Sequence, residues 1–464
     1  MLFLFKGKNK INDSNTRIIF IYFTIIFFFM NLFNLSLKFN GFPIDEAQAY
    51  LKEIQSKNDD ELKVYIETKK QEIVTYHLEN NSFYKAFAKG VNTKDWNSVP
   101  IMSKHDLQQP LENRLSKGFT TKNVYINKTS GSSGNPFIFA KDKFCHALTW
   151  AIFIDRYSWF NLNFKNSKQA RFYGIPLNKK GYYKERLKDK LSNRFRFSVF
   201  DLSDEQLKKN IEKFKSTHFD YINGYTSSIV QFAKYLKRKN MVLNTICPSL
   251  KACIVTSEML FEKDKLLLET QFGVPVINEY GAAELGLIAF QNKKDEWLIN
   301  TEDLFVEILD ENNNVLPIGK EGRIVITSFY NKAHPFIRYD LGDVGTLSKT
   351  STTQKPILEK LIGRTDDIIR LPSGKKAAGL TFYYVTKTII EDSGHVKEFI
   401  IEQLKLDTFK ITYVGLDALS EKEKTNVEAA ISKYLEPNLK VNFERKDKLE
   451  RSNRGKLKQF KSYL

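Results

Sequence analysis

Between residues 219 and 292 the chain repeats one arrangement, in which a short apolar run is followed by a polar turn and a helical segment. FDYINGYTSSIVQFAKYLKRKN is typical of a strand and then an amphipathic helix that starts at Thr-Ser-Ser. KACIVTSEML predicts a buried strand, a polar turn and a helix, and VPVINEYGAAELGLIAF is expected to repeat the scheme. Strands alternating with helices are typical of parallel sheets in α/β layers, so this segment predicts an α/β fold.

The segments before it predict helices and one hairpin. Residues 42–70 have apolar side chains at helical spacing and few breakers, which indicates a helix. VPIMSKHDL turns at Pro100, and Ser103 is expected to cap a following helix. Short alternating runs at 124–127 and 136–140 flank a glycine- and serine-rich loop, which predicts a strand, a loop and a second strand.

The length and the later segments indicate more than one domain. A chain of 464 residues that is 42% hydrophobic exceeds one ordinary domain. After residue 296 short strands and turns are typical of antiparallel β structure, and the last hundred residues or so resemble a small α+β unit. We predict a basic and apolar N-terminal segment (1–38), a large domain of mixed sheets and helices with a β-rich portion (39–365), and a small α+β C-terminal domain (366–464).

The N-terminal segment leaves three interpretations open. Its apolar core runs only from Ile18 to Met30, which is short for a helix that spans a bilayer in about 20 residues. It is interpreted as an uncleaved membrane anchor, an amphipathic surface segment, or sequence upstream of a true start at Met30. If the segment is a membrane anchor, residues 18–37 would mediate membrane association, and the body of the protein would lie in the cytoplasm at the inner face of the membrane.

Composition excludes several classes of protein. The 72 Lys and Arg against 54 Asp and Glu give a net charge of +18, but the basic residues are spread along the chain without a nucleic-acid-binding motif. We therefore expect no specific nucleic-acid partner, while the positive field attracts anionic substrates. Cys145, Cys247 and Cys253 lack metal or CxxC spacing, which argues against a disulfide framework. The six histidines form no HxxxH pair, so a histidine-based metal site has little support.

The loop TSGSSGNP, residues 129–136, is suited to an anion. Successive backbone amides in a Gly/Ser loop form a concave phosphate nest. A Walker A motif would continue with Lys-Ser/Thr into a helix, whereas here Gly134 is followed by Asn, Pro and Phe. No GxGxxG opens a helix either, which excludes a Rossmann fingerprint. A plain hairpin would explain the loop equally well without further motifs.

Further motifs follow in order. TSGSSGNP resembles the phosphate-binding loop of the adenylate-forming enzymes, and the set is most similar to the phenylacetate-CoA ligase branch and its capsular polysaccharide relatives of the CapK type. The supporting segments are VPIMSKHDL, INGYTSSIVQFAKYL, VTSEML, NEYGAAELG, FIRYDLGD, GRTDDII and RGKLKQF. Each is weak alone, but the ordered set is specific.

The resemblance implies roles for the loop and for NEYGAAELG. Tyr280 would stack against or flank the adenine, Gly281 would allow the backbone to approach the nucleotide, and Glu284 would help to hold Mg²⁺, which usually takes one or two carboxylates beside phosphates. Ala283 departs from the family pattern, which often has Thr or Ser before this Glu. The predicted β/γ-phosphate flap consists of Thr129, Ser130, Gly131, Ser132, Ser133 and Gly134.

The resemblance also implies roles for later residues. Asp343 would accept the ribose hydroxyls, with Asp340 as the rival, because a carboxylate accepts two hydrogen bonds at once. Arg364 would lie near the ribose and α-phosphate, beside the hinge carboxylates Asp366 and Asp367. Lys456 would be catalytic, offsetting negative charge as two anions meet, although the tail around it is basic throughout.

The implied activity is ATP-dependent activation of a small-molecule carboxylate to an acyl- or aryl-adenylate with release of pyrophosphate. ATP and Mg²⁺ would be the cofactors, and the acyl group would pass to CoA or to another acceptor such as a carrier protein or a sugar. The residues 366–464 would then form a mobile lid that carries Lys456. The alternative is a non-catalytic or scaffolding protein of membrane-associated polysaccharide assembly, which Ala283 and the apolar N-terminus favour mildly.

Overall fold

A computed structural model describes residues 32–129, 137–175, 179–364, 368–378, 396–415, 417–451 and 457–464. Ser130, Gly131, Ser132, Ser133, Gly134, Asp366, Asp367 and Lys456 lie outside these ranges, as do the first 31 residues with the greater part of the predicted membrane segment. Within the ranges, no helix is both long enough and apolar enough to cross a bilayer.

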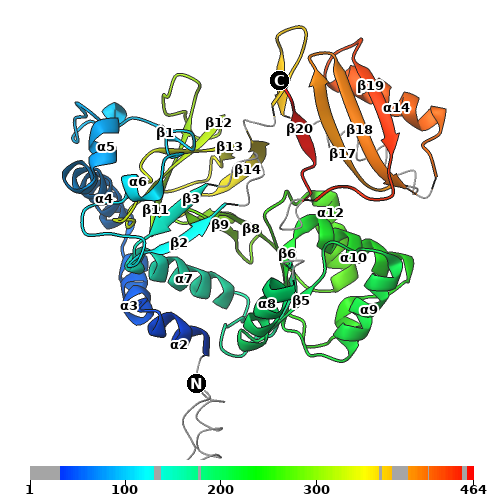
Figure 1. The fold of residues 1–464 in the computed structure, drawn as a ribbon, viewed down its shortest axis with the longest axis horizontal. Coiled ribbons are helices and arrows are strands. Elements are labelled where there is room, and N and C mark those ends of the chain that lie inside the picture. Colours follow the sequence, from blue (N-terminus) through cyan, green and yellow to red (C-terminus); the bar gives the residue numbers. More distant parts are fainter. Residues whose placement is uncertain are drawn as a thin grey trace, which may run out of the picture.

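A seven-stranded sheet forms the centre of the larger part of the chain (Figure 1). Its strands, in spatial order, are β5 (Arg194–Phe197), β4 (Gln169–Phe172), β6 (Tyr221–Tyr225), β7 (Ala252–Thr256), β8 (Val276–Ala282), β9 (Gly286–Gln291) and β10 (Trp297–Ile299). The strands from β5 to β8 are parallel, whereas β9 and β10 are antiparallel additions. The prediction of an α/β fold with parallel strands is confirmed.

Helices cover both faces of this sheet. One face packs against α9 (Asp204–Lys215), α10 (Thr226–Arg238), α11 (Leu243–Ile246) and α12 (Glu262–Phe272). The other face packs against α7 (Lys143–Ser158) and α3 (Ile44–Gln55). The central strands are buried on both sides, which explains why YINGY and ACIVT lack a polar-apolar alternation.

A second sheet of five strands lies beside the first and is mostly antiparallel, as predicted for the region after residue 296. It consists of β1 (Met102–Ser103), β13 (Tyr339–Leu347), β12 (Glu321–Ser328), β11 (Leu304–Leu309) and β14 (Leu358–Arg364), and only the pair of β1 with β13 is parallel. The remaining N-terminal elements are α2 (Leu32–Phe39), α4 (Asp59–Asn80), α5 (Ser82–Phe87), a 3-10 helix (Trp96–Ser98) and α6 (Leu111–Arg114).

The predicted strands around the glycine loop are present as a hairpin. β2 (Tyr125–Lys128) pairs antiparallel with β3 (Ile138–Lys141). The backbone amide of Thr129 donates to the carbonyl of Phe137 at 2.9 Å, and the amide of Phe137 donates to the hydroxyl of Thr129 at 3.0 Å. These two bonds close the base of the loop, so Thr129 has a structural task at the edge of the phosphate flap.

Three local predictions were wrong. The helix expected over 42–70 is divided into α3 and α4, because Asn58 caps α4 through a reciprocal bond with Glu61. Ser103 lies in β1 and bonds to Asp106 instead of capping a helix. The segment after β8 forms the strand β9 and not a helix, since its apolar run is short enough to pair as a buried strand.

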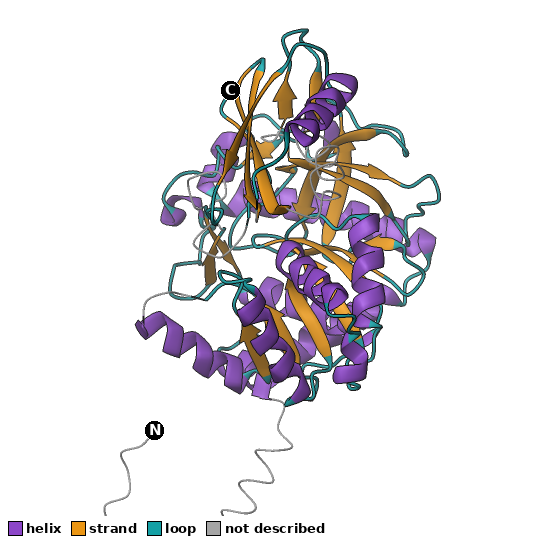
Figure 2. Cartoon of the chain, turned by 90° about the vertical axis from the view of Figure 1, so that its right-hand side faces the viewer, coloured by secondary structure: helices purple, strands orange, loops and turns teal. Residues whose placement is uncertain are grey.

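The C-terminal part has its own core. A four-stranded sheet of β19 (Lys440–Arg445), β18 (Thr408–Gly415), β17 (Val396–Lys405) and β20 (Phe460–Ser462) packs against α14 (Glu421–Tyr434). A short hairpin of β15 (Ile368–Arg370) and β16 (Lys376–Ala378) precedes it. Figure 2 shows these strands at the top of the molecule, beside the C-terminus. The expected strands around a helix are therefore present.

A buried charge network joins α7 to the segment between β10 and β11. The guanidinium of Arg156 lies 2.5 Å from Glu302 and donates to Asn300 at 2.7 Å. Asp303 is buried next to it, and burial raises the pKa of its carboxyl from 3.8 to about 7, although Lys141 opposes the shift. The folded protein therefore holds a proton on Asp303 more tightly than the unfolded chain does.

We expect this proton to make folding stability depend on pH. Because the pKa of Asp303 is higher in the folded state, its contribution is present below about pH 4 and is lost as the pH rises through about 7. Urea unfolding of the wild type and of Asp303→Asn across this range measures it. The difference between the two unfolding free energies should change with pH in that window, and a constant difference would contradict the assignment.

Candidate active site

The turn between β8 and β9 holds three of the predicted site residues. Tyr280 and Gly281 end β8, and Glu284 lies in the turn itself. The register of the two strands shifts between Tyr280 and Gly281. A Cβ at Gly281 would lie 2.6 Å from the carbonyl oxygen of Gly286, so a larger residue would push the strands apart. The turn itself requires this glycine, independently of any nucleotide.

Tyr280 and Asp343 are in direct contact. The hydroxyl of Tyr280 donates to Oδ2 of Asp343 at 2.7 Å, and both side chains are buried. The ring of Tyr280 meets that of Trp297 edge-on, with the centroids 5.9 Å apart. Tyr280 thus orients the carboxylate of Asp343 on β13, while its contact with adenine stays a prediction.

Glu284 is held by a residue that the sequence analysis missed. The hydroxyl of Tyr339 donates to Oε1 of Glu284 at 3.2 Å, and the glutamate is only 6% exposed. Tyr339 and Asp343 both belong to β13. One strand therefore positions both carboxylates of the site. The signal was available, because Tyr339 stands inside the FIRYDLGD motif.

The structure distinguishes Asp343 from Asp340, the alternative candidate for accepting the ribose hydroxyls. The carboxylate of Asp340 is paired with Arg323 at 2.5 Å and accepts the amide of Gly342 at 2.9 Å. The charge of Asp340 is therefore neutralised by Arg323 within the second sheet. Asp343 instead faces Tyr280, and its backbone is paired with that of Arg364 on β14. The backbone of Arg364 is therefore next to the site.

Polar side chains from several elements lie where the parallel strands end, which is the usual place for a ligand in an open α/β sheet. The hydroxyl of Tyr157 donates to Oε2 of Glu279 at 2.8 Å. Burial raises the pKa of Glu279, while the bonds from Tyr157 and Thr256 and the charge of Arg171 oppose the shift. The guanidinium of Arg171 lies over the ring of Tyr173 at 4.2 Å, and its Nε has no hydrogen-bond partner among the described residues.

The motifs did not predict that these polar side chains come together. The segment RFYGIP is rich in aromatic residues, which are more often part of a core. Arg171 and Tyr173 belong to that segment, and Glu279 directly precedes Tyr280 in the motif. Their common location depends on the order of β4, β6, β7 and β8 in the sheet, which the sequence does not state.

The described residues contain no cluster of three or more His, Cys, Asp or Glu side chains placed to hold a metal ion. A magnesium site of the predicted kind does not require such a cluster, because Mg²⁺ keeps waters and takes much of its coordination from substrate phosphates. Glu284, a single buried carboxylate at the end of β8, fits that donor set.

Comparison with solved structures identifies the fold. The chain aligns with 2-hydroxyisobutyryl-CoA ligase in the postadenylation state with a TM-score of 0.66 and 15% identity, covering 86% of this chain and 88% of that one. The same ligase in its thioesterification state gives 0.53. The fold is that of the adenylate-forming enzymes.

Sequence comparison identifies the branch. CapK of Staphylococcus aureus is 24% identical over 315 residues, which is 65% of this chain and 67% of that protein. A phenylacetate-coenzyme A ligase of Aromatoleum evansii is 24% identical over 402 residues, which is 83% of this chain and 87% of that protein. No family model matches the chain. The resemblance drawn from the motifs is confirmed: the chain is similar to the phenylacetate-CoA ligase and CapK branch and has the fold of the adenylate-forming enzymes.

Proposed function

We propose that the protein activates a carboxylic acid with ATP and transfers the acyl group to CoA. In the first step a carboxylate oxygen attacks the α-phosphorus, and the bond to pyrophosphate breaks. In the second step the thiol of CoA attacks the acyl carbon, and AMP leaves. The observation that carries the proposal is the meeting of Tyr280, Glu284 and Asp343 at one turn, although Asp343 lies 63 residues from Tyr280 in the chain.

Each residue of the site has a proposed role. Asp343, oriented by Tyr280, would accept the ribose hydroxyls. Glu284, held by Tyr339, would bind Mg²⁺, whose chemistry is to neutralise charge on the phosphates when it is bound. Arg364 and Lys456 would offset the negative charge that builds up as the carboxylate approaches the α-phosphate.

The loop 129–134 would cover the β- and γ-phosphates, with Thr129 fixing one end of it. The C-terminal residues 366–464 would act as a lid, because Lys456 must approach the nucleotide for adenylation and withdraw for the transfer to CoA. That part of the chain has a core separate from those of the larger sheets, as a moving unit requires.

The buried polar side chains at the ends of the parallel strands favour an acid that carries a second polar group. Glu279 and Arg171 are a carboxylate and a guanidinium in a mostly buried place, and polar groups of this kind are stabilised by a ligand that bonds to them. The similarity to CapK supports a role in capsular or surface polysaccharide assembly, in which the acceptor would be a sugar or a carrier in place of CoA.

A pyrophosphate-release assay tests the proposal. The full chain would be incubated with ATP, Mg²⁺ and each member of a panel of aliphatic, aromatic and hydroxyl- or carboxyl-substituted acids. We expect release with a subset of the acids, and Lys456→Ala should lower the rate by about 100- to 1,000-fold. Lys458→Ala is the matched control in the same basic tail and should keep the activity. Release by no acid, or equal release by Lys456→Ala, would contradict the proposal.

A further inference from the structure

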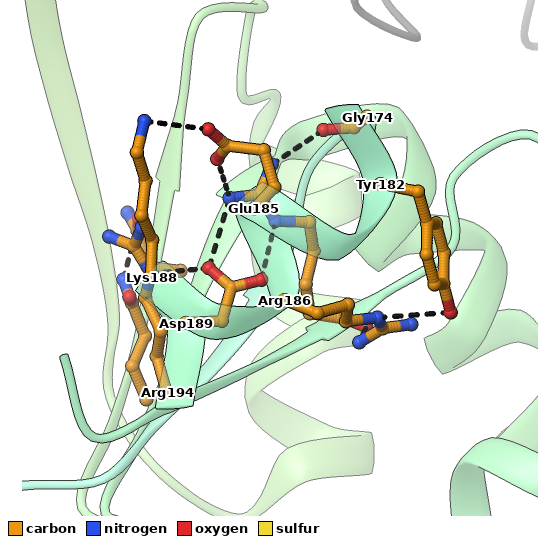
Figure 3. A network of polar contacts seen from close by, with 10 residues as sticks. Gly174, Tyr182, Glu185, Arg186, Lys188, Asp189 and Arg194 are labelled. Carbon is orange, nitrogen blue, oxygen red and sulfur yellow. Dashed lines mark hydrogen bonds and ion pairs between the residues drawn. The ribbon is translucent and has the colours of Figure 1, made fainter. Parts of the chain in front are cut away.

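The helix α8 (Lys179–Leu191) separates its residues into two opposite faces. Its sequence, KKGYYKERLKDKL, contains six basic and two acidic residues. Both acids point inward: Asp189 bonds to Arg194 and to Arg196, and Glu185 bonds to Arg196 (Figure 3). The acidic charge of the helix is therefore neutralised within the protein.

The inward face anchors the helix to the edge strand β5. Nη2 of Arg196 lies 3.0 Å from Asp189 and 2.9 Å from Glu185, and Nη1 donates to the carbonyl of Gly174 at 2.8 Å (Figure 3). Arg186 donates to the carbonyl of Arg196 at 2.9 Å. Since these bonds use the helix positions 182, 185, 186 and 189, they fix which side of α8 faces away from the sheet.

The outward face carries two parallel stripes. Tyr183, Leu187 and Leu191, spaced by four residues, are 70%, 59% and 57% exposed. Residues four apart lie on the same side of a helix, so these three side chains form one apolar stripe. The second stripe is cationic and also repeats every four residues; it consists of the exposed Lys180, Lys184 and Lys188, of which Lys188 also pairs with Glu185 at 2.8 Å (Figure 3).

This pattern has a specific physical use. A helix with lysines beside an exposed apolar stripe lies in the plane of a membrane interface, where the apolar side chains enter the headgroup region and the lysines meet anionic lipids. In Figure 1, α8 and α2 both lie on the lower side of the molecule.

We propose that the outward face of α8 is a docking surface for an anionic lipid bilayer. The charge complementarity selects this partner, because with both acids turned inward the exposed residues of the helix are only lysines and apolar side chains. The surface is separate from the candidate active site and does not depend on the proposed function. It predicts peripheral binding that weakens as salt is added.

A fluorescent label on the apolar stripe tests the proposal directly. The native Cys145, Cys247 and Cys253 are buried, so a cysteine introduced by Leu187→Cys in the full chain can be labelled selectively with an environment-sensitive fluorophore. Its emission should shift to the blue with vesicles of phosphatidylcholine and phosphatidylglycerol, and not with phosphatidylcholine alone. Leu266→Cys on α12, at a position 66% exposed, is the matched control and should show no shift.

Removing the cationic stripe tests the electrostatic part. The triple substitution Lys180→Gln, Lys184→Gln and Lys188→Gln should weaken binding to the anionic vesicles about fivefold for each of Lys180 and Lys184, and less for Lys188 because it is paired with Glu185. The total loss should be at least about 25-fold. The control makes the same change of charge on α9, where no large apolar side chain is exposed: Lys208→Gln, Lys209→Gln and Lys215→Gln.

Three results would overturn the proposal. The first is an unchanged emission at position 187 with anionic vesicles. The second is an equal loss of vesicle binding in the two triple variants, which would mean that net charge alone is responsible. The third is a blue shift at position 187 without vesicles that grows with protein concentration, which would make a second copy of the chain the partner of α8.

Discussion

Replacing Glu284 with glutamine is expected to lower the rate of pyrophosphate release by about 100-fold or more, because the site would lose the charge that we propose holds Mg²⁺ against the phosphates. The substitution keeps the shape of the side chain, and the amide oxygen can still accept the bond from Tyr339. The loss should therefore appear in kcat and in the apparent affinity for Mg²⁺, while the melting temperature stays near that of the wild type.

Tyr339→Phe is the companion variant. It removes the hydroxyl that donates to Glu284 at 3.2 Å and leaves the carboxylate in place. We expect a smaller loss than for Glu284→Gln, part of which added Mg²⁺ should restore, because the residue positions the carboxylate without binding the metal. Wild-type activity in Glu284→Gln at limiting Mg²⁺ would contradict the assignment of the metal to this turn.

Replacing Arg338 with methionine is expected to destabilise the larger part of the chain by about 3–5 kcal/mol, the usual cost of leaving one partner of a buried ion pair alone. Arg338 and Glu307 are paired at 3.3 Å with both side chains 2% exposed. Arg338, which directly precedes β13, also donates to the carbonyl of Val99 at 2.9 Å and so connects β13 to the end of the 3-10 helix. Urea unfolding of the variant measures the loss.

The double variant Arg338→Met with Glu307→Leu separates the ion pair from simple packing. Because it removes both charges, it should recover most of the stability that the single variant loses. The carbonyl of Val99 would still lack its donor, so full recovery is not expected. A double variant as unstable as the single one would show that the loss has another cause. The presence of Arg338 in the FIRYDLGD motif is thus explained by its contribution to stability, through the ion pair with Glu307.

The sequence was sufficient for the parts of the fold that depend on neighbours along the chain. Strand and helix alternation over 219–292 predicted the parallel sheet, and the runs beside the glycine loop predicted β2 and β3 to within two residues. The error at β9 has a physical cause, since the short apolar run LGLIAF suits a buried strand or a buried helix equally. Only the partner strand β8 decides between them.

The candidate site was likewise predictable only in part from the sequence. The ordered motifs identified Tyr280, Glu284 and Asp343 as a set, but not that Tyr280 would orient Asp343 or that Tyr339 would hold Glu284. These contacts join β8 and its turn to β13, strands of two different sheets. A contact between sheets leaves no periodic pattern in either strand, so the motif could offer Tyr339 as a candidate residue but could not pair it with Glu284.

The amino-acid sequence by itself determined the resemblance to the adenylate-forming enzymes, the motifs in their order and the alternation that builds the central sheet, because each of these is carried by residues close together in the chain. The tertiary structure alone decided which side of α8 faces solvent, since that depends on the arginines of β5 that bind Glu185 and Asp189. It also decided which aspartate of YDLGD faces the site, because Arg323 on β12 engages Asp340 and leaves Asp343 to face Tyr280.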